Sequence, residues 1–344
     1  MNVSISVVLP VYNSASTLER CLQALSLQSF NNFELIVVDN GSTDSSLAII
    51  ESWLEKFPAG MRLIQESRQG AAAARNSGVR ASRGHWLAFT DSDCEPDQDW
   101  LSTGWKLIAK NSPEAMAGSA WGTMQGGLSA KLLGLTTLSI GLQEHWRDSN
   151  GETGANGFAT ANFWIEKVLF DQLHGFDEEL TVSGEDYDLC ARIYALHKRI
   201  LYSPSLKVLH HHAPGVSDLL SKAVRYGRAH GMLFDRYGRP GLYFDLFGGH
   251  RKTIAIRKKI WLNLVSADKK TVFLLLLSLI WPGCFVLVLL YPLLPAHFLR
   301  QRAEMQCGKL GLFEAYAMGW LMILRSLAFT VGRIQGRQPG VWVC

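Results

Sequence analysis

Residues 5–40 read ISVVLPVYNSASTLERCLQALSLQSFNNFELIVVDN, and this stretch decides the fold class. Residues 5–9 and 35–38 are short apolar runs rich in β-branched side chains, which is typical of buried strands. Between these runs, residues 17–28 place apolar side chains at helical spacing. The order strand, helix, strand predicts an α/β protein whose parallel sheet is covered by helices.

The same alternation continues further along the chain. Residues 45–57 again have helical spacing, and residues 86–89 (WLAF) form the next apolar run. Polar residues follow all three expected strands, at 10–13, 39–42 and 91–93. Ligands of such sheets bind at the carboxyl ends of the strands. We therefore expect the three polar segments to converge on a ligand site.

The absence of two nucleotide-binding motifs restricts the classes of ligand that this site can bind. No G-x-G-x-x-G follows the first strand, and the chain has no G-x-x-x-x-G-K-[ST], which argues against dinucleotide oxidoreductases and P-loop NTPases. Asp91 and Asp93 instead stand two residues apart, so that both can face one site in an extended chain. Carboxylate oxygens suit Mg²⁺ or Mn²⁺ bridging to a diphosphate. An acidic surface turn is the alternative.

A second acidic group lies at residues 184–188 (GEDYD). Leu189, Ile193 and Leu196 predict an apolar helical face, which places Glu185 and Asp186 at the helix start. Carboxylates are stabilised there by the helix dipole and the free N–H groups, so helix capping alone is one interpretation. The other is that a carboxylate open to a cleft serves as the general base for a hydroxyl nucleophile.

Three consecutive histidines, His210, His211 and His212, end another apolar run. Strand alternation predicts that His210 and His212 share one face and His211 the other. The spacing of Cys and His does not favour zinc. We expect His210 to complete a Mg²⁺ or Mn²⁺ site or to contact phosphate; a solvated strand end is the alternative.

Six motifs occur in the order expected of family 2 glycosyltransferases, which this chain resembles over residues 3–230. They are SVVLPVYN at 6–13, VVDNGSTD at 37–44, ARNSG at 74–78, DSD at 91–93, GFDE at 175–178 and GED at 184–186. The resemblance implies a GT-A fold, which is a Rossmann-like sheet with helices on both faces. It also implies an inverting transfer from a nucleotide-sugar whose nucleotide is UDP, GDP or dTDP.

The resemblance further implies roles for individual residues. Asp186 would be the catalytic base with Glu185 beside it, and Asp93 would bind the metal with His210 on the metal or the diphosphate. Asn40 stands where many family members have a second Asp, which removes a charge near the nucleotide. The residues that would bind the nucleotide-sugar are Pro10, Tyr12, Asn13, Asp39, Gly41, Arg75, Asn76 and Asp91.

The C-terminal part differs in character from the rest of the chain. Seven Lys and Arg residues lie between 251 and 270, and residues 271–291 carry no charge. As one helix this run would extend about 30 Å, enough to cross a bilayer, and the preceding cations place that side in the cytoplasm. Pro282 allows a kinked helix or a re-entrant hairpin instead. A buried core helix is the remaining alternative.

Residues 310–332 form a second apolar stretch that contains Glu314 and Arg325. This stretch is either a poorer span or a helix in the membrane interface. We expect one or two membrane helices at 271–344, a basic linker at 231–270, and a catalytic domain at 1–230 that faces the cytoplasm at the inner membrane.

Overall charge and the missing synthase motif restrict the partners. The chain has 34 Lys+Arg against 30 Asp+Glu, a net charge of +4, which is too mild for a nucleic-acid binder that acts through a basic field. Processive members of the family usually carry Q-x-x-R-W, whose nearest counterpart here is KAVRYGR at 222–228. Arg225, Arg228 and His230 are expected on a solvated or phosphate-facing side of that helix.

We therefore expect one sugar to be added to a hydroxyl of a lipid-linked or other cell-envelope glycan. Two alternatives stay open at this point. The acceptor is a polyprenyl phosphate, or the protein is a non-catalytic nucleotide-binding scaffold at the membrane. Both lipid and saccharide are thus expected partners.

Overall fold

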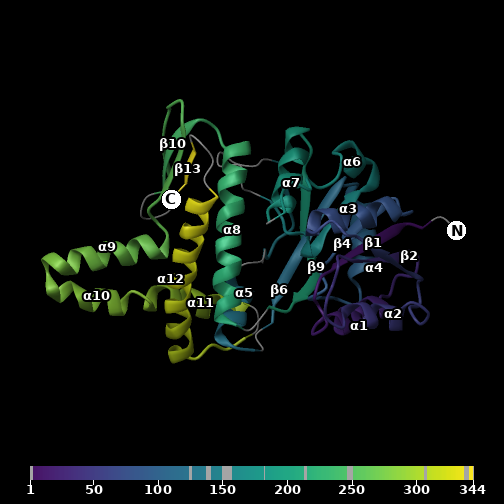
Figure 1. The fold of residues 1–344 in the computed structure, drawn as a ribbon, viewed down its shortest axis with the longest axis horizontal. Coiled ribbons are helices and arrows are strands. Elements are labelled where there is room, and N and C mark those ends of the chain that lie inside the picture. Colours follow the sequence, from purple (N-terminus) through teal and green to yellow (C-terminus); the bar gives the residue numbers. More distant parts are fainter. Residues whose placement is uncertain are drawn as a thin grey trace.

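The computed structural model describes residues 3–123, 126–136, 141–148, 157–181, 183–212, 215–245, 251–305, 308–336 and 341–343. A large sheet covered by helices occupies one side of the molecule, and a group of C-terminal helices with a small sheet occupies the other (Figure 1). The long helix α8 (Val216–Tyr237) stands between these two parts.

The first half of the large sheet follows the predicted alternation. Four parallel strands have the order β3-β2-β1-β4. The elements are β1 (Ile5–Val11), α1 (Leu18–Ser26), β2 (Phe33–Asp39), α2 (Ser46–Trp53), β3 (Met61–Gln65), α3 (Ala71–Ala81) and β4 (Trp86–Phe89). The three predicted strands and both predicted helices are confirmed, whereas β3 and α3 had not been predicted. The run in β3 is short and half-buried, so its apolar signal is weak.

The three strands predicted to lie in a parallel sheet do so, whereas the second half of the sheet is mixed. The order continues β8-β6-β9-β5, and β8 is antiparallel to both β4 and β6. Alternating apolar runs indicate strands but carry no information on strand direction. The elements are β5 (Cys94–Pro96), α4 (Trp100–Asn111), β6 (Ala115–Gly122), α5 (Leu128–Thr136), β7 (His145–Arg147), β8 (Phe163–Glu166), α6 (Lys167–Gln172), α7 (Glu185–Ala195) and β9 (Ile200–His210).

Helices cover both faces of this sheet, as predicted. Val7 and Leu9 of β1 pack with α1 and α4 through Leu22 and Trp100. Val8, which points the opposite way, packs in the second core cluster with α3, α6 and α7. The alternation of side chains along one strand thus supplies both layers of the core.

The C-terminal part combines four strands with several helices. Its strands form a second sheet of order β11-β10-β12-β13, in which residues 241–263 supply three strands. The elements are β10 (Gly241–Asp245), β11 (Arg251–Ile254), β12 (Lys259–Asn263), α9 (Ala267–Ile280), α10 (Phe285–Leu290), α11 (Leu293–Met305), α12 (Leu312–Gln335) and β13 (Val341–Val343).

The uncharged run 271–291 is not one helix, which corrects the prediction of a single span of that length. Helix α9 ends at Ile280, a 3-10 turn occupies Pro282–Cys284, and α10 returns alongside α9 (Figure 1). Pro282 lacks an N–H group and restricts the backbone, so the chain turns there. Two helical segments are long and apolar enough to cross a membrane: Pro282–Met305, which begins inside this run, and Leu312–Gln335.

Helices α8 and α12 touch through their backbones. A Cβ atom on Gly227 of α8 would collide with the carbonyl oxygen of Phe329, and one on Gly332 of α12 would collide with that of Val224. Each helix carries a G-x-x-x-G segment here, GRAHG at 227–231 and GRIQG at 332–336. Small residues at this spacing allow a close helix crossing. The contact holds α12 beside the large sheet's domain.

Candidate active site

A cleft of about 890 Å³ lies where the strands β1 and β4 end. Its walls come from three places: the strand-end loops, the start of α7, and the facing sides of α8 and α12. Eight of the predicted site residues line it together: Pro10, Tyr12, Arg75, Asp91, Asp93, Glu185, Asp186 and His210. The lining found among the described residues does not include Asn13, Asp39, Gly41 or Asn76.

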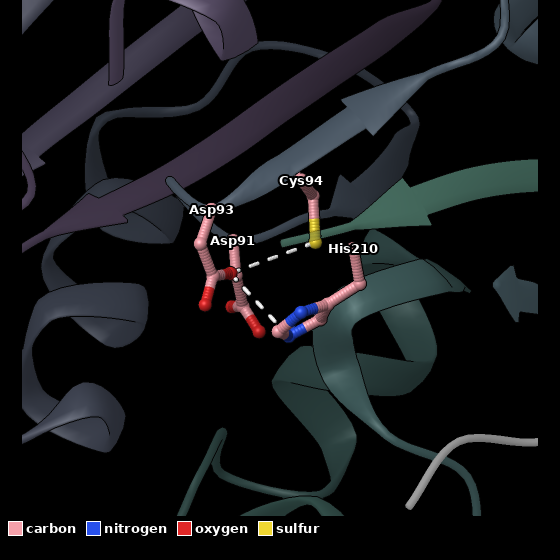
Figure 2. A group of neighbouring side chains, drawn as sticks. All are labelled: Asp91, Asp93, Cys94 and His210. Carbon is pink, nitrogen blue, oxygen red and sulfur yellow. Dashed lines mark hydrogen bonds and ion pairs between the residues drawn. The ribbon is translucent and has the colours of Figure 1, made fainter. Parts of the chain in front are cut away.

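One corner of the cleft gathers metal-ligand side chains (Figure 2). Asp91, Asp93, Cys94 and His210 each bring one ligand atom, and these atoms all lie within 4.8 Å of one another. Strands β5 and β9 pair with Cys94 opposite His210, which carries the histidine to the acidic loop. Nε2 of His210 lies 3.4 Å from Oδ1 of Asp93, and its buried Nδ1 has no hydrogen-bond partner among the described residues.

Carboxylate oxygens dominate this group, with one imidazole and one thiol. The Sγ atom of Cys94 lies 3.7 Å from Oδ1 of Asp93, to which it donates, and burial raises the pKa of the thiol well above its usual range. Two carboxylates and an imidazole fit Mg²⁺ or Mn²⁺. Sequence spacing had not included Cys94, one of six cysteines, of which Cys307 and Cys344 lie outside the described residues.

The three histidines alternate as predicted. The rings of His210 and His212 stack with centroids 4.2 Å apart. His211 points the other way, and its Nε2 lies 2.6 Å from Oε1 of Glu95. Burial lowers the pKa of His212 to about 2, helped by the nearby His210, Lys222 and Arg325. His212 is therefore neutral at physiological pH.

Arg75 links the two acidic motifs. Its Nη2 donates to Oδ1 of Asp91 over 2.7 Å, and its Nη1 donates to Oε1 of Glu185 over 2.8 Å. Arg75 is only 4% exposed, so this bridge lies in the interior between α3, the end of β4 and the start of α7. The guanidinium group of Arg75 thus bridges the two carboxylates, and the bridge fixes the positions of Asp91 and Glu185 in the cleft wall.

Asp186 differs from Glu185, although the two are adjacent at the start of α7. The preceding Gly184 has φ +100°, a conformation that favours glycine, and it begins the helix. Burial raises the pKa of Asp186 to about 7, and the negative charge of Glu185 adds to the effect. The Tyr187 N–H donates to its Oδ1 over 2.8 Å. Asp186 thus lines the cleft as a carboxylate that can accept a proton near neutral pH.

Residues 6–162 match the family model described as Glycosyl transferase family 2. The match covers just under half of the chain, and over this region the chain is similar to glycosyl transferase family 2. The resemblance inferred from the six motifs is thereby confirmed, and so is the prediction of an enzyme that transfers a sugar. The alternative of a non-catalytic scaffold is set aside.

Curated relatives of this glycosyltransferase agree with that assignment. It is 28% identical to "Glycosyltransferase AglE" of Haloferax volcanii over 226 residues, which are 65% of this chain and 72% of the relative. It is 27% identical to "Glycosyltransferase GlyG" of Streptococcus pneumoniae over 214 residues, 59% of this chain and 68% of the relative. Each of these similarities therefore covers less than two thirds of this chain.

Solved structures confirm the GT-A fold. The mannosyltransferase PcManGT from Pyrobaculum calidifontis, in complex with GDP-Man and Mn²⁺, superposes with a TM-score of 0.52 and 21% identity. That match covers 68% of this chain and 65% of that chain. Staphylococcus aureus TarS 1–349 gives a TM-score of 0.50 with 20% identity, over 68% of this chain and 71% of that chain.

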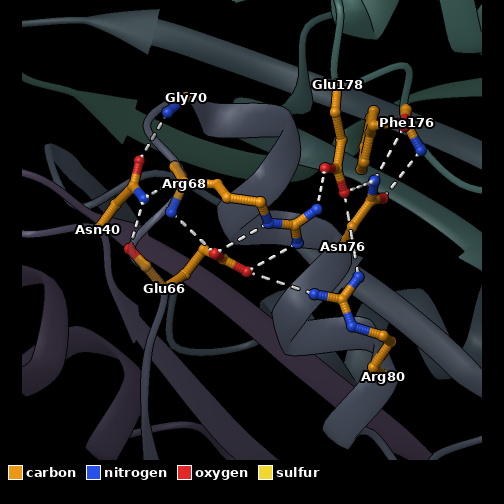
Figure 3. A network of polar contacts seen from close by, with 8 residues as sticks. All are labelled: Asn40, Glu66, Arg68, Gly70, Asn76, Arg80, Phe176 and Glu178. Carbon is orange, nitrogen blue, oxygen red and sulfur yellow. Dashed lines mark hydrogen bonds and ion pairs between the residues drawn. The ribbon is translucent and has the colours of Figure 1, made fainter.

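Asn40 of the glycosyltransferase has a structural task. Its Nδ2 donates to the carbonyl oxygens of Glu66 and Arg68 over 2.9 and 2.7 Å, and its Oδ1 accepts from the Gly70 N–H over 2.8 Å (Figure 3). An Asp could accept the last bond but could not donate the first two. The residue that departs from the usual family pattern therefore holds residues 66–70 in place beside the cleft.

The predicted residues outside the cleft lining stabilise its loops. Oδ1 of Asn13 accepts from the Thr43 N–H over 2.8 Å, and Oδ1 of Asp39 accepts from the Ser42 N–H over 3.2 Å. Gly41 has φ +76°, which lets the chain turn between them. Together these contacts fix the loop that follows β2.

Asn76 performs a similar task on α3. Its Nδ2 donates to the Phe176 carbonyl oxygen and to Oε1 of Glu178, each over 2.9 Å, and its Oδ1 accepts from the Phe176 N–H (Figure 3). The ARNSG and GFDE motifs thus meet in space. Their connection carries the chain toward α7 and its acidic start.

The C-terminal half of the cleft wall had been largely missed. Lys222, Arg225, Tyr226 and His230 reach the cleft from α8, and Arg325 and Phe329 reach it from α12. Arg228, grouped with Arg225 in the sequence, instead donates to Oε1 of Gln335 at the surface. The sequence signal that could have indicated this wall is the pair of G-x-x-x-G segments, because such segments predict that two helices approach closely.

Proposed function

We propose that this glycosyltransferase transfers one sugar, with inversion, from a nucleotide-sugar to a hydroxyl of a lipid-linked or other cell-envelope glycan. The observation that carries the proposal is that Asp186, with its raised pKa, lines the same cleft as the Asp93–His210 group. A proton acceptor and a site for a diphosphate are the two parts that such a reaction requires.

The reaction is a single displacement. Asp186 takes the proton of the acceptor hydroxyl while that oxygen attacks the anomeric carbon from the face opposite the nucleotide. The bond between the anomeric carbon and the diphosphate breaks as the new glycosidic bond forms, so the configuration inverts. Glu185 is held by Arg75, and its negative charge raises the pKa of Asp186, which favours the transfer of the proton to Asp186.

The metal site is proposed at Asp93 and His210, with Asp91 beside them. A bound Mg²⁺ or Mn²⁺ would offset the charge that develops on the departing diphosphate. PcManGT, which shares the fold, has been solved with Mn²⁺ and GDP-Man, and that supports the same class of cofactor and donor here.

Donor binding is proposed on the strand-end side of the cleft. Tyr12 is 54% exposed at the cleft and offers an aromatic face to a base, with Pro10 next to it. Asp91 would face the ribose and diphosphate. Asn13, Asp39, Gly41 and Asn76 would act through the loops that they fix, with Arg75 aligning Asp91.

Membrane attachment is the last part of the proposal. The division into a catalytic domain at 1–230, a basic connection at 231–270 and a membrane-associated region at 271–344 rests on the apolar α9–α12 region and the cations before it. We propose that the catalytic domain faces the cytoplasm at the inner membrane, in contact with lipid.

Calorimetric titration with UDP-, GDP- and dTDP-sugars, with and without Mn²⁺, tests the proposal. Metal-dependent binding of one donor is expected, and Asp93→Ala is expected to lose it. Asp171→Ala, an exposed carboxylate that pairs only with Lys167 among the described residues, is the matched control. Absence of binding to every donor by folded protein would contradict the proposed donor class.

A further inference from the structure

Three cations from the C-terminal side of the chain line the same cleft as the acidic residues. Lys222 and Arg225 come from α8, and Arg325 comes from α12. In the described part of the chain, no carboxylate forms an ion pair with any of them. Two carboxylates that line the cleft, Asp91 and Glu185, are held by Arg75 instead. Unpaired cations that share a cleft wall are suited to an anionic ligand.

Arg325 is the member that connects the C-terminal region to the cleft. It is half-buried, and its Nη1 donates to Oγ1 of Thr136 over 3.3 Å, a long bond that leaves most of the guanidinium donors free among the described residues. Lys222, Arg225 and Arg325 line the same cleft as His210 of the proposed metal site.

We propose that Lys222, Arg225 and Arg325 bind the phosphate or diphosphate of a lipid-carried acceptor. The inference rests on the proposed function and specifies the acceptor's chemical class. The Asp93–His210 group already provides for the donor's diphosphate at the strand ends. The basic group comes from other elements, with Lys222 and Arg225 on α8 and Arg325 on α12 of the apolar C-terminal region.

The apolar surface of that region identifies the lipid part of the acceptor. Leu279, Ile280 and Trp281 at the turn between α9 and α10 are 80%, 69% and 62% exposed. Helix α9 packs against α12, which carries Arg325. Asp268 at the start of α9 accepts a hydrogen bond from Ser326, the neighbour of Arg325 on α12. A lipid lying along α9 from the exposed turn would thus bring its phosphate toward Arg325, and the sugar beyond that phosphate would extend toward Asp186.

The test uses the full chain in detergent and two simple probes. Farnesyl phosphate and farnesyl diphosphate are titrated by calorimetry, with farnesol as the uncharged control. The variants are Lys222→Gln and Arg325→Gln, with Arg325→Lys to retain the charge. Arg228→Gln is the matched control, because Arg228 is a neighbouring cation on α8 that bonds Gln335 outside the cleft lining. Thermal unfolding verifies that each variant is folded.

We expect Lys222→Gln and Arg325→Gln each to weaken farnesyl phosphate binding about tenfold or more, because a charge-assisted hydrogen bond is lost. Arg228→Gln should bind as the wild type does, and Arg325→Lys should recover most of the affinity. UDP and GDP, titrated with Mn²⁺, should bind all variants equally. That combination places the acceptor's phosphate on the basic group.

Three results would overturn the inference. The wild type fails to bind farnesyl phosphate and diphosphate, the folded glutamine variants bind them unchanged, or only the nucleoside diphosphates lose affinity, which would assign the cations to the donor. Failure of the proposed function has a different signature, since it appears as an absence of nucleotide-sugar binding in the wild type. The prenyl-phosphate titration does not depend on that result.

Discussion

The two walls of the cleft are built in opposite ways. The acidic wall consists of short motifs at strand ends and at one helix start, and its carboxylates are tied together by Arg75. The basic wall consists of side chains on α8 and α12, two helices far apart in sequence that meet through glycines. Local pattern dictates the first wall and tertiary contact dictates the second, which is why sequence motifs reveal only the first.

Among changes to the acidic wall, loss of the proposed base should have the largest effect on activity. Asp186→Asn is expected to lower kcat roughly 10²–10⁴-fold, because general-base catalysis supplies a factor of this size. Turnover of donor and acceptor by purified variant is the measurement. Substantial remaining activity would instead favour a phosphate acceptor, which is already an anion and needs no base.

Removing the bridge should break the acidic wall itself. Arg75→Met leaves Asp91 and Glu185 near each other without their cation, which is expected to cost about 3–5 kcal/mol in the free energy of unfolding. Denaturant unfolding measures it. Arg80→Met, an exposed arginine on the same helix, is the control and should cost much less. An equal decrease in the free energy of unfolding for both variants would contradict the proposed role of Arg75 as a bridge.

A single methyl group should disturb the basic wall while leaving the acidic wall intact. Gly332→Ala forces a Cβ against the Val224 carbonyl oxygen, and we expect a loss of about 1–3 kcal/mol together with weaker farnesyl phosphate binding. Gly311→Ala is the control, because a Cβ there would meet no atom of the described residues within 4 Å. Donor binding that falls along with farnesyl phosphate binding would show that the two walls are not independent.

Asn40 offers a smaller test of the acidic wall's support. Asn40→Asp keeps the shape but removes both donated hydrogen bonds, which should destabilise the fold by about 1–3 kcal/mol. Thermal unfolding compares it with Asn32→Asp at the surface, whose amide bonds only the Ser4 hydroxyl among the described residues. An unchanged midpoint of thermal unfolding, together with an altered preference among nucleotide-sugars, would instead indicate that this position acts through its charge near the nucleotide.

The smallest expected effect is that of pH. Because the pKa of Asp186 is raised to about 7 and the base must be deprotonated to act, kcat/KM should fall as pH decreases below about 7, approaching tenfold per unit. A pH–rate profile measures this limb. Any activity that remains in Asp186→Asn should lack it, and a profile that stays flat down to pH 5 in the wild type would contradict the assignment.

Much of the first wall could be predicted because each signal is local. The strands at 5–9, 35–38 and 86–89 stand out as apolar runs, and Glu185 and Asp186 precede an apolar helical face. The alternation of His210 and His211 follows from strand geometry alone. What pattern could not supply was the direction of β8 or the pairing of Cys94 with His210, since both depend on strand register.

The rest depends on contacts between distant segments. Arg325 was interpreted as a charge that weakens an apolar stretch, whereas it lines the cleft. From the sequence, Asn40 is notable for the negative charge that it lacks, whereas in the structure its amide N–H groups donate two hydrogen bonds that hold the neighbouring loop. Asn13, Asp39, Gly41 and Asn76 belong to the family motifs, yet in this structure they brace loops. A motif identifies which positions matter, and the structure shows through which contacts they act.

The glycine crossing of α8 and α12 also sets an order of assembly. A ribosome makes the strand-end residues, Asp186 and then Lys222 well before it makes Arg325 and Phe329. The nascent large sheet can pack as soon as its strands have emerged, because its core clusters contain no residue of α12. The cleft is therefore completed late in translation, because the basic wall forms only after the apolar hairpin has been synthesised.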